Sequence, residues 1–211
     1  MAGTLGCCAM RDRIALKTYA DILQNTGHHL YRYLHAVPML VSPVLDAACG
    51  TGYGSYLFAE RGHNVTAVDI SSEATDFGKR WWANGNIHWI TADLTTAPWG
   101  WERFKTVVSF ETLEHLKEPE KALKCFYEAL EARGKLICSV PNEEQYPFKP
   151  EDFEGEEYPH QRHYTPAEFN ELLESNGFEV IHRGTQLSKQ SPVVVNGSGG
   201  RFLVYTAQKR G

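Results

Sequence analysis

Hydrophobic residues along this chain gather in two kinds of segment that alternate with each other. Short apolar runs, several of them ending at glycine or aspartate, are typical of strands buried in a parallel sheet. Longer segments with apolar residues three or four positions apart are typical of helices that bury one face. We expect strands at 43–48, 64–70, 86–92, 105–110 and 134–141, and helices at 54–62, 72–83 and 121–130.

The two ends of the chain extend this pattern. Residues 11–36 have the apolar spacing of an N-terminal helix. A capping box that begins at Thr165, with proline at the first helical position, starts a helix that ends near Gly177. The β-like segments 178–184 and 201–208 then predict a closing hairpin. Because strands separated by helices imply right-handed crossovers, we predict an α/β fold with a mostly parallel sheet.

Composition excludes several classes of protein. The 211 residues include 21 basic and 26 acidic side chains, a net charge of −5, and 42% of them are hydrophobic. These values argue against a disordered chain, a collagen-like chain and a generally basic nucleic-acid-binding protein. No apolar run approaches a membrane span of about 18 residues, and the N-terminal charges follow the apolar stretch, the reverse of a signal peptide. Five cysteines without a CxxC pair predict reduced thiols and a cytoplasmic location.

The first predicted strand leads into a glycine-rich turn that opens a helix. This turn runs from Asp46 through Gly50 and Gly52, and glycines let the backbone approach a ligand that a Cβ would exclude. In an open α/β sheet, ligands lie beyond the carboxyl ends of the strands, where this turn is located. Asp69 ends the second strand and Asp93 follows the third. Three acids at successive strand ends suit a ligand with an adenosine and a cationic end.

A dinucleotide site is the main alternative for such a turn. Its GxGxxG helix terminus binds a pyrophosphate. Here the spacing is AxGxG after Asp46, and an acid at that position repels phosphate but favours an amino group. The turn therefore favours a cofactor with a positive charge over a dinucleotide.

Five motifs follow one another in a familiar order: VLDAACGTG, AVDIS, ITADL, SFETLEHL and GKLICSVPN. From about residue 28 to the end, the chain resembles the class I S-adenosylmethionine-dependent methyltransferases. Ala48 stands where the first motif of that family, E/DxGxGxG, usually has glycine, which slightly narrows the turn. The resemblance implies a Rossmann-like, seven-stranded, mostly parallel sheet with helices on both faces and an N-terminal helical cap. The last strand, near 201–208, is then antiparallel between its neighbours.

The resemblance also implies how the chain is divided and where the cofactor binds. S-adenosylmethionine is the expected cofactor, with S-adenosylhomocysteine as product; Asp69 would hold the ribose and Asp93 the adenine edge. In the N-terminal helix, Arg32 would meet the methionine carboxylate and Tyr33 would close over the cofactor; a surface helix with a solvated arginine is the alternative. One domain is expected, with a cap (1–42), a cofactor-binding core (43–142), an acidic active-site loop (143–164) and a C-terminal helix and hairpin (165–211). The assigned cofactor residues are Arg32, Tyr33, Asp46, Ala48, Gly50, Gly52, Asp69, Ile70, Asp93, Leu94 and Phe110.

Two segments carry candidate chemistry for the methyl acceptor. Glu111, Glu114 and His115 follow the fourth strand, where one helical turn would bring all three together. His160 and His163 lie just before the last predicted helix. Mixed carboxylate and imidazole ligands are a known combination for Mg²⁺, Mn²⁺ or Zn²⁺. Alternatively, the acids complement a helix dipole while the histidines pack against the sheet.

The ExxEH pattern resembles two subfamilies. The small-RNA 3′-terminal 2′-O-methyltransferases use ExxEH and a later histidine, which matches His160, to bind a divalent metal. The ubiquinone-type and other small-molecule O-methyltransferases also show ExLEH, and in many of them a segment similar to HxRHYT supplies a base. The resemblance implies a metal set of Glu111, Glu114, His115 and His160, with Mg²⁺ or Mn²⁺, or catalysis by His115, His160, Glu111 and His163.

Charge separates these two subfamilies. Residues 143–157 hold seven acids and one base, and RNA affinity depends mainly on lysine and arginine contacts to phosphates. The acidic loop therefore argues against a nucleic-acid partner, although five bases follow residue 182 without an acid. We predict O-methylation of a small-molecule hydroxyl on a sugar, an aromatic ring or a natural product. The alternatives are metal-dependent 2′-O-methylation of an RNA 3′ end, small-molecule N-methylation, and a cofactor-binding regulatory domain.

Overall fold

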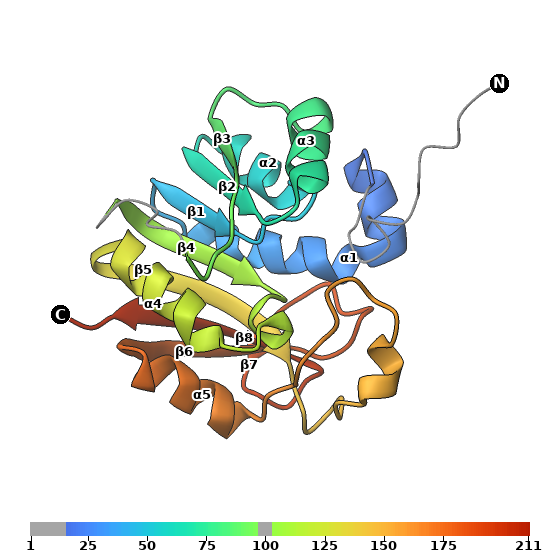
Figure 1. Cartoon of the computed structure of the whole chain (residues 1–211), viewed down its shortest axis with the longest axis vertical. Coiled ribbons are helices and arrows are strands. Elements are labelled where there is room, and N and C mark those ends of the chain that lie inside the picture. Colours follow the sequence, from blue (N-terminus) through green and yellow to red (C-terminus); the bar gives the residue numbers. More distant parts are fainter. Residues whose placement is uncertain (1–15, 97–102) are drawn as a thin grey trace.

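The computed structural model describes residues 16–96 and 103–211. These residues form one sheet of eight strands with helices on both faces (Figure 1). The strands are β1 (Val44–Ala47), β2 (Val65–Asp69), β3 (Ile87–Thr91), β4 (Phe104–Phe110), β5 (Leu130–Pro141), β6 (Phe178–Gln186), β7 (Val195–Asn196) and β8 (Phe202–Lys209). Their order across the sheet is β3-β2-β1-β4-β5-β8-β6-β7.

The direction of the strands decides where a ligand can bind. The first five strands run parallel, so their carboxyl ends meet at one edge of the sheet. β8 is antiparallel to both β5 and β6, between which it lies. The predicted place of the last strand is therefore confirmed. β7 adds an eighth strand to the seven expected, as a two-residue piece that pairs with β6.

Two apolar clusters form the core, one on each face of the sheet. Alternate strand residues enter opposite clusters, as Leu136 and Ile137 of β5 do. The clusters pack against α1, α2 and α3 on one face and α4 and α5 on the other. No helix within the described ranges is long and apolar enough to span a membrane. The helices are α1 (Tyr19–Ala36), α2 (Tyr53–Ala59), α3 (Ser72–Trp81), α4 (Pro119–Ala129) and α5 (Pro166–Ser175).

The N-terminal helix is shorter than the predicted 11–36, of which residues 11–15 lie outside the described part. α1 begins at Tyr19 because the Thr18 hydroxyl accepts a hydrogen bond from a backbone N–H of its first turn. At Thr26 the backbone departs from helical geometry, so α1 is kinked there. The residues after the kink carry Arg32 and Tyr33 toward the carboxyl edge of the sheet.

Candidate active site

The turn between β1 and α2 holds three residues in the left-handed conformation. Gly50 and Gly52 have φ values of 55° and 88°, which glycine adopts without steric cost. Ala48 has a φ of 61°, where a Cβ costs roughly 1–2 kcal/mol. Ala48, which stands where the family usually has glycine, is therefore a point of backbone strain.

Gly52 is small for a reason that the motif alone does not reveal. A Cβ at Gly52 would lie 2.1 Å from the Trp89 ring, and one at Gly78 would lie 2.4 Å from the same ring. Similarly, a Cβ at Gly54 would lie 2.0 Å from the Tyr33 ring. Gly52 makes room for an indole from β3, and it is not part of the cavity wall described next.

A cavity of about 250 Å³ opens beyond the carboxyl ends of the parallel strands. Eight of the eleven predicted cofactor residues line it, and so do two of the predicted catalytic residues, Glu111 and His115. The eight are Tyr33, Ala48, Gly50, Asp69, Ile70, Asp93, Leu94 and Phe110. Seven further residues complete the wall: His29, Cys49, Thr51, Tyr53, Thr112, Leu116 and Tyr158.

Two acids of the wall are oriented by backbone N–H groups. The Asp69 carboxylate accepts hydrogen bonds of 2.9 Å from the backbone N–H groups of Gly50 and Ser71. One oxygen of Asp93 accepts from the backbone and the hydroxyl of Thr95, at 2.8 and 2.7 Å. Carboxylates held in this way suit the hydroxyl or amino donors of a ligand.

Asp46 lies behind the wall. Its carboxylate is fully buried and accepts hydrogen bonds from Ser55 Oγ at 2.5 Å and Tyr33 Oη at 3.2 Å. Burial raises the pKa of this carboxyl to about 7, although both hydrogen bonds oppose the rise. The sequence predicted that Asp46 lies beside an amino group of the ligand. In the structure Asp46 does not line the cavity, and it is connected to the cavity by its hydrogen bond with Tyr33, which does line it.

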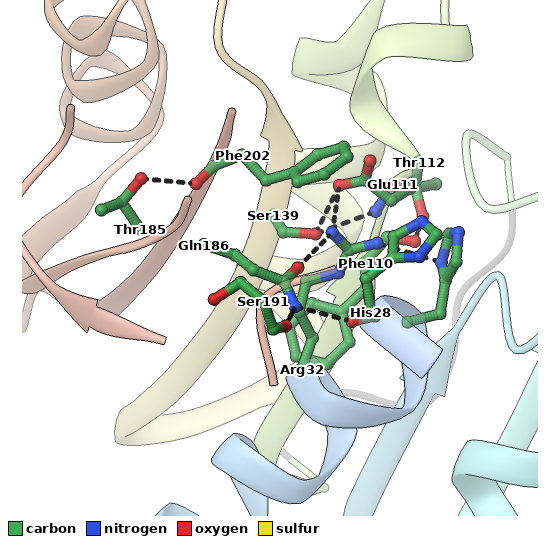
Figure 2. Close-up of polar contacts among 11 residues, drawn as sticks. His28, Arg32, Phe110, Glu111, Thr112, Ser139, Thr185, Gln186, Ser191 and Phe202 are labelled. Carbon is green, nitrogen blue, oxygen red and sulfur yellow. Dashed lines mark hydrogen bonds and ion pairs between the residues drawn. The ribbon is translucent and has the colours of Figure 1, made fainter. Parts of the chain in front are cut away.

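Arg32 also lies behind the wall, with no exposed surface. Its guanidinium donates to Gln186 Oε1 at 3.1 Å, lies 3.0 Å from His29 Nδ1 and stands 3.8 Å from Glu111 Oε1 (Figure 2). Gln186 in turn donates to the carbonyl oxygens of His28 and Ser191. Arg32 therefore joins α1 to the ends of β4 and β6 from a buried position, and the alternative of a solvated arginine is wrong.

Glu111 does not share a helical turn with Glu114 and His115 as the spacing predicted. Its φ is 49°, and the 3₁₀ turn (Leu113–His115) begins after it. The Glu111 carboxylate instead accepts a 2.7 Å hydrogen bond from Ser139 Oγ and faces Arg32 (Figure 2). A left-handed glutamate is costly, and such outliers often lie at functional sites.

Glu114, His115 and His160 come together as a possible metal-binding group. One potential ligand atom from each lies within 4.8 Å of the others, and Glu111 is not part of the set. Both Glu114 oxygens are buried without a hydrogen-bond partner among the described residues. Burial, and then the nearby Glu111, raise the pKa of Glu114 well above its usual range. A bound cation would compensate for the burial of this acid, which has no side-chain donor among the described residues.

Backbone carbonyls determine which nitrogen of each histidine carries the proton. The Tyr158 carbonyl lies 2.7 Å from His115 Nδ1, and the Tyr146 carbonyl lies 2.6 Å from His163 Nδ1. Because a carbonyl only accepts, both Nδ1 atoms must donate. His163 Nε2 then accepts from His160 Nδ1, 2.8 Å away. In neutral rings, His115 and His160 are both left with an unprotonated Nε2, the form of a base or a metal ligand.

His163 and Tyr158 show what spacing alone could and could not find. His163 is buried, does not line the cavity, and its Nε2 lies 2.8 Å from His160 Nδ1. Tyr158 lines the cavity and orients His115, although its sequence signal was only that of an aromatic residue in a loop. His29, beside the predicted Arg32–Tyr33 pair, also had no separate signal.

The family described as a methyltransferase domain matches residues 15–183. A probable S-adenosylmethionine-dependent methyltransferase of Mycolicibacterium smegmatis is 30% identical over 141 residues, 65% of this chain and 52% of that protein. A ubiquinone biosynthesis O-methyltransferase of Coxiella burnetii is 32% identical over 101 residues, 47% of this chain and 43% of that protein. The chain spans about half the length of the curated relatives it matches.

Solved structures share the fold. A possible histamine N-methyltransferase of Thermotoga maritima has a TM-score of 0.71 at 21% identity, covering 91% of this chain and 95% of its own. The 1,6-didemethyltoxoflavin-N1-methyltransferase of Burkholderia thailandensis, with bound S-adenosylhomocysteine, has a TM-score of 0.67 at 22% identity, covering 91% and 82%. Since the family match covers most of the chain, the protein belongs to the class I S-adenosylmethionine-dependent methyltransferases.

Proposed function

We propose that this chain is an S-adenosylmethionine-dependent enzyme that methylates a hydroxyl group of a small molecule: a sugar, an aromatic compound or a natural product. One observation carries the proposal. A single cavity extends across the strand ends from Asp69 and Asp93, beside β2 and β3, to Glu111 and His115, beyond β4. Its first part suits an adenosine and its second part suits an acceptor.

The first part would bind the cofactor through a few side chains. Asp69 would accept hydrogen bonds from the ribose hydroxyls and Asp93 from the adenine amino group, while Ile70 and Leu94 cover the ring faces. S-adenosylmethionine, when bound, supplies a methyl group from its sulfonium to the acceptor oxygen, which loses its proton. Tyr33 would close the cavity from α1 and exclude water.

The second part would handle the proton of the acceptor hydroxyl. His115 lines the cavity, and its unprotonated Nε2 makes it the residue placed to accept this proton. His160 is a weak base, because burial and then His115 lower its pKa to about 3. A neutral imidazole of this kind suits a metal ligand. Glu114, His115 and His160 would hold Mg²⁺ or Mn²⁺, which would lower the pKa of the hydroxyl.

The O-methylation is supported by the relative from Coxiella burnetii, whose name describes an O-methyltransferase of ubiquinone biosynthesis. The three-residue group is also the feature that favours a second candidate, metal-dependent 2′-O-methylation of an RNA 3′ end. The acidic loop, with seven acids in residues 143–157, opposes that candidate.

Release of S-adenosylhomocysteine tests both candidates. We would assay the full chain with catechols, sugars and short RNAs, with and without EDTA, and with Mg²⁺ or Mn²⁺ restored. Release with a small hydroxyl compound is expected. Loss of activity in EDTA and its recovery with metal would support the Glu114, His115 and His160 site, whereas insensitivity to EDTA would leave His115 as the base. Activity on RNA alone would favour the second candidate, and cofactor binding without turnover would favour a regulatory domain.

A further inference from the structure

A series of neighbouring side chains connects two residues of the cavity wall, His29 and His115. The His29 ring, which lines the cavity, lies 4.3 Å from the His28 ring. His28 stacks on Phe202 at 5.7 Å, and the Arg201 guanidinium carbon stands 5.8 Å from the same Phe202 ring. Figure 2 shows His28, from α1, and Phe202, from the start of β8, in the group of residues around Arg32.

The series continues from Arg201 to His115, the second of its members that lines the cavity. The guanidinium carbon of Arg201 lies 3.6 Å from the centre of the Tyr146 ring, which is 4.7 Å from the His163 ring. His163 lies 5.1 Å from His160, which lies 4.5 Å from His115 in the cavity wall. We call this set the ring belt: His29, His28, Phe202, Arg201, Tyr146, His163, His160 and His115.

Arg201 is the permanently charged member of the ring belt. Its Nε is buried without a hydrogen-bond partner, and no acid lies within ion-pair distance of its guanidinium, both among the described residues. A buried N–H without an acceptor is costly. The guanidinium packs against the Tyr146 ring, which restricts its motion. A planar guanidinium can bind a carboxylate with two parallel hydrogen bonds.

Lys189 provides a second positive charge near the ring belt. It is exposed on the connection between β6 and β7, and within the described ranges it has no ion pair. Burial is the main reason for the lowered pKa values of His28 and His29, and the charge of Lys189 lowers both further. Lys189 lies between Gln186 and Ser191, and Gln186 donates to the carbonyl oxygens of both His28 and Ser191, so this connection packs beside the His28 end of the belt. The charge of Lys189 also lowers the pKa of His160.

Two acids near the ring belt, Glu111 and Glu143, are already engaged, and a third, Glu114, lies at the His115 end of the belt, with a carboxylate oxygen within 4.8 Å of a nitrogen of His115 and of His160. Glu111 accepts from Ser139 and faces Arg32. Glu143 accepts a hydrogen bond from the Phe148 backbone and lies 3.9 Å from His163 Nδ1. Two cations thus remain for a ligand, while the acidic loop next to them would repel a molecule with many negative charges.

We propose, building on the proposed function, that the methyl acceptor carries a carboxylate and that Arg201, assisted by Lys189, binds it. The ring belt would surround the acceptor, with its anionic group at Arg201 and its hydroxyl group toward His115. A singly charged carboxylate matches this balance of charges better than a phosphate, which carries close to two charges at pH 7.

Two compounds that differ only in charge test the proposal: 3,4-dihydroxybenzoate and 3,4-dihydroxybenzamide. Their affinities for the full chain would be measured by calorimetry, with and without S-adenosylhomocysteine. The wild-type protein should bind the benzoate about 10- to 100-fold more tightly, as expected for hydrogen bonds between charged groups. Arg201→Gln should abolish this preference, because it should weaken binding of the benzoate far more than binding of the benzamide. Arg183→Gln, which removes an exposed arginine of β6 that contacts Asn170, is the matched control and should keep the preference.

A second variant covers the case in which Arg201→Gln does not fold. Lys189→Gln alters an exposed side chain and should reduce the preference severalfold, and added salt should reduce it in the wild-type protein. Equal affinity for the two compounds, including no measurable affinity for either, would overturn the proposal. So would a preference that survives Arg201→Gln, or tighter binding of a short RNA than of the benzoate. Carboxylate preference without release of S-adenosylhomocysteine would refute the proposed function alone.

Discussion

The two parts of the cavity are built in different ways. The cofactor part is formed by the ends of neighbouring parallel strands, and Asp69 is oriented by backbone N–H groups only 2 and 19 residues away in the chain. The acceptor part is formed by side chains from α1, from the residues after β4 and from the loop after β5. Glu114, His115 and His160 meet there across about 45 residues of sequence. The first part depends on local backbone geometry and the second on long-range packing.

This difference predicts that the two parts respond differently to mutation. A substitution in the turn after β1 changes the backbone itself, so it should alter stability or cofactor affinity. A substitution in the ring belt removes one side chain among several, so it should alter use of the acceptor while the cofactor still binds. The predictions below test this contrast, beginning with the largest expected effect.

Gly52→Ala should destabilise the protein most. The new Cβ would lie 2.1 Å from the Trp89 ring at a backbone φ of 88°, so overpacking and left-handed strain add together. We expect the free energy of unfolding in urea to fall by roughly 3–4 kcal/mol. Gly50→Ala is the matched control: a Cβ there meets nothing within 4 Å, and only the strain of roughly 1–2 kcal/mol remains. Equal losses in the two variants would contradict the role given to Trp89.

Asp69→Ala should weaken binding of S-adenosylmethionine about 10- to 100-fold, because hydrogen bonds to a charged group contribute roughly 1.5–3 kcal/mol. His160→Ala, at the acceptor part, should leave this affinity within about twofold of the wild type, since His160 does not line the cavity. Calorimetry on both folded variants measures the contrast. An unchanged affinity in Asp69→Ala would remove Asp69 from the cofactor site.

The cofactor part could be predicted well from sequence because its signals are local. Apolar runs located the buried strands. Residues at the end of a strand, such as Asp69, or shortly after it, such as Asp93, then had to lie at the carboxyl edge of the sheet. Glu111 shows the limit of this reasoning. Helical spacing placed it with Glu114, but a left-handed backbone turns it toward Ser139, which is 28 residues away. No periodic pattern encodes such a turn.

The histidines show the same limit. Spacing singled out His160 and His163, but their order in the chain of hydrogen bonds depends on the Tyr146 carbonyl. Arg201, in the ring belt, had no signal beyond its place among scattered bases. Contacts between distant loops depend on how those loops pack, and a single sequence carries no direct record of that packing.

Asp46 should make stability depend on pH. Its pKa is raised to about 7 by burial, from 3.8, so the folded protein keeps a proton that the unfolded chain loses. Stability should therefore fall as pH rises from about 4 to about 7 and then level off. Asp46→Asn, which stays neutral, should be more stable than the wild type at pH 8 by roughly 1–3 kcal/mol and similar to it at pH 4. Urea unfolding of both proteins without cofactor at the two pH values measures this, and parallel pH profiles would contradict the raised pKa.

Ala48→Gly should produce the smallest effect, and in the opposite direction. Ala48 has a φ of 61° in the turn where the family usually has glycine, so removing its Cβ relieves roughly 1–2 kcal/mol of strain. The added freedom of the unfolded chain offsets about 0.4–1 kcal/mol of this gain. A net stabilisation of about 0.5–1 kcal/mol in urea unfolding is expected. Ala47→Gly is the control, because Ala47 is an extended residue of β1 and the same change there should destabilise. A loss of stability in Ala48→Gly would mean that its methyl group packs more favourably in the cavity wall than the backbone strain costs.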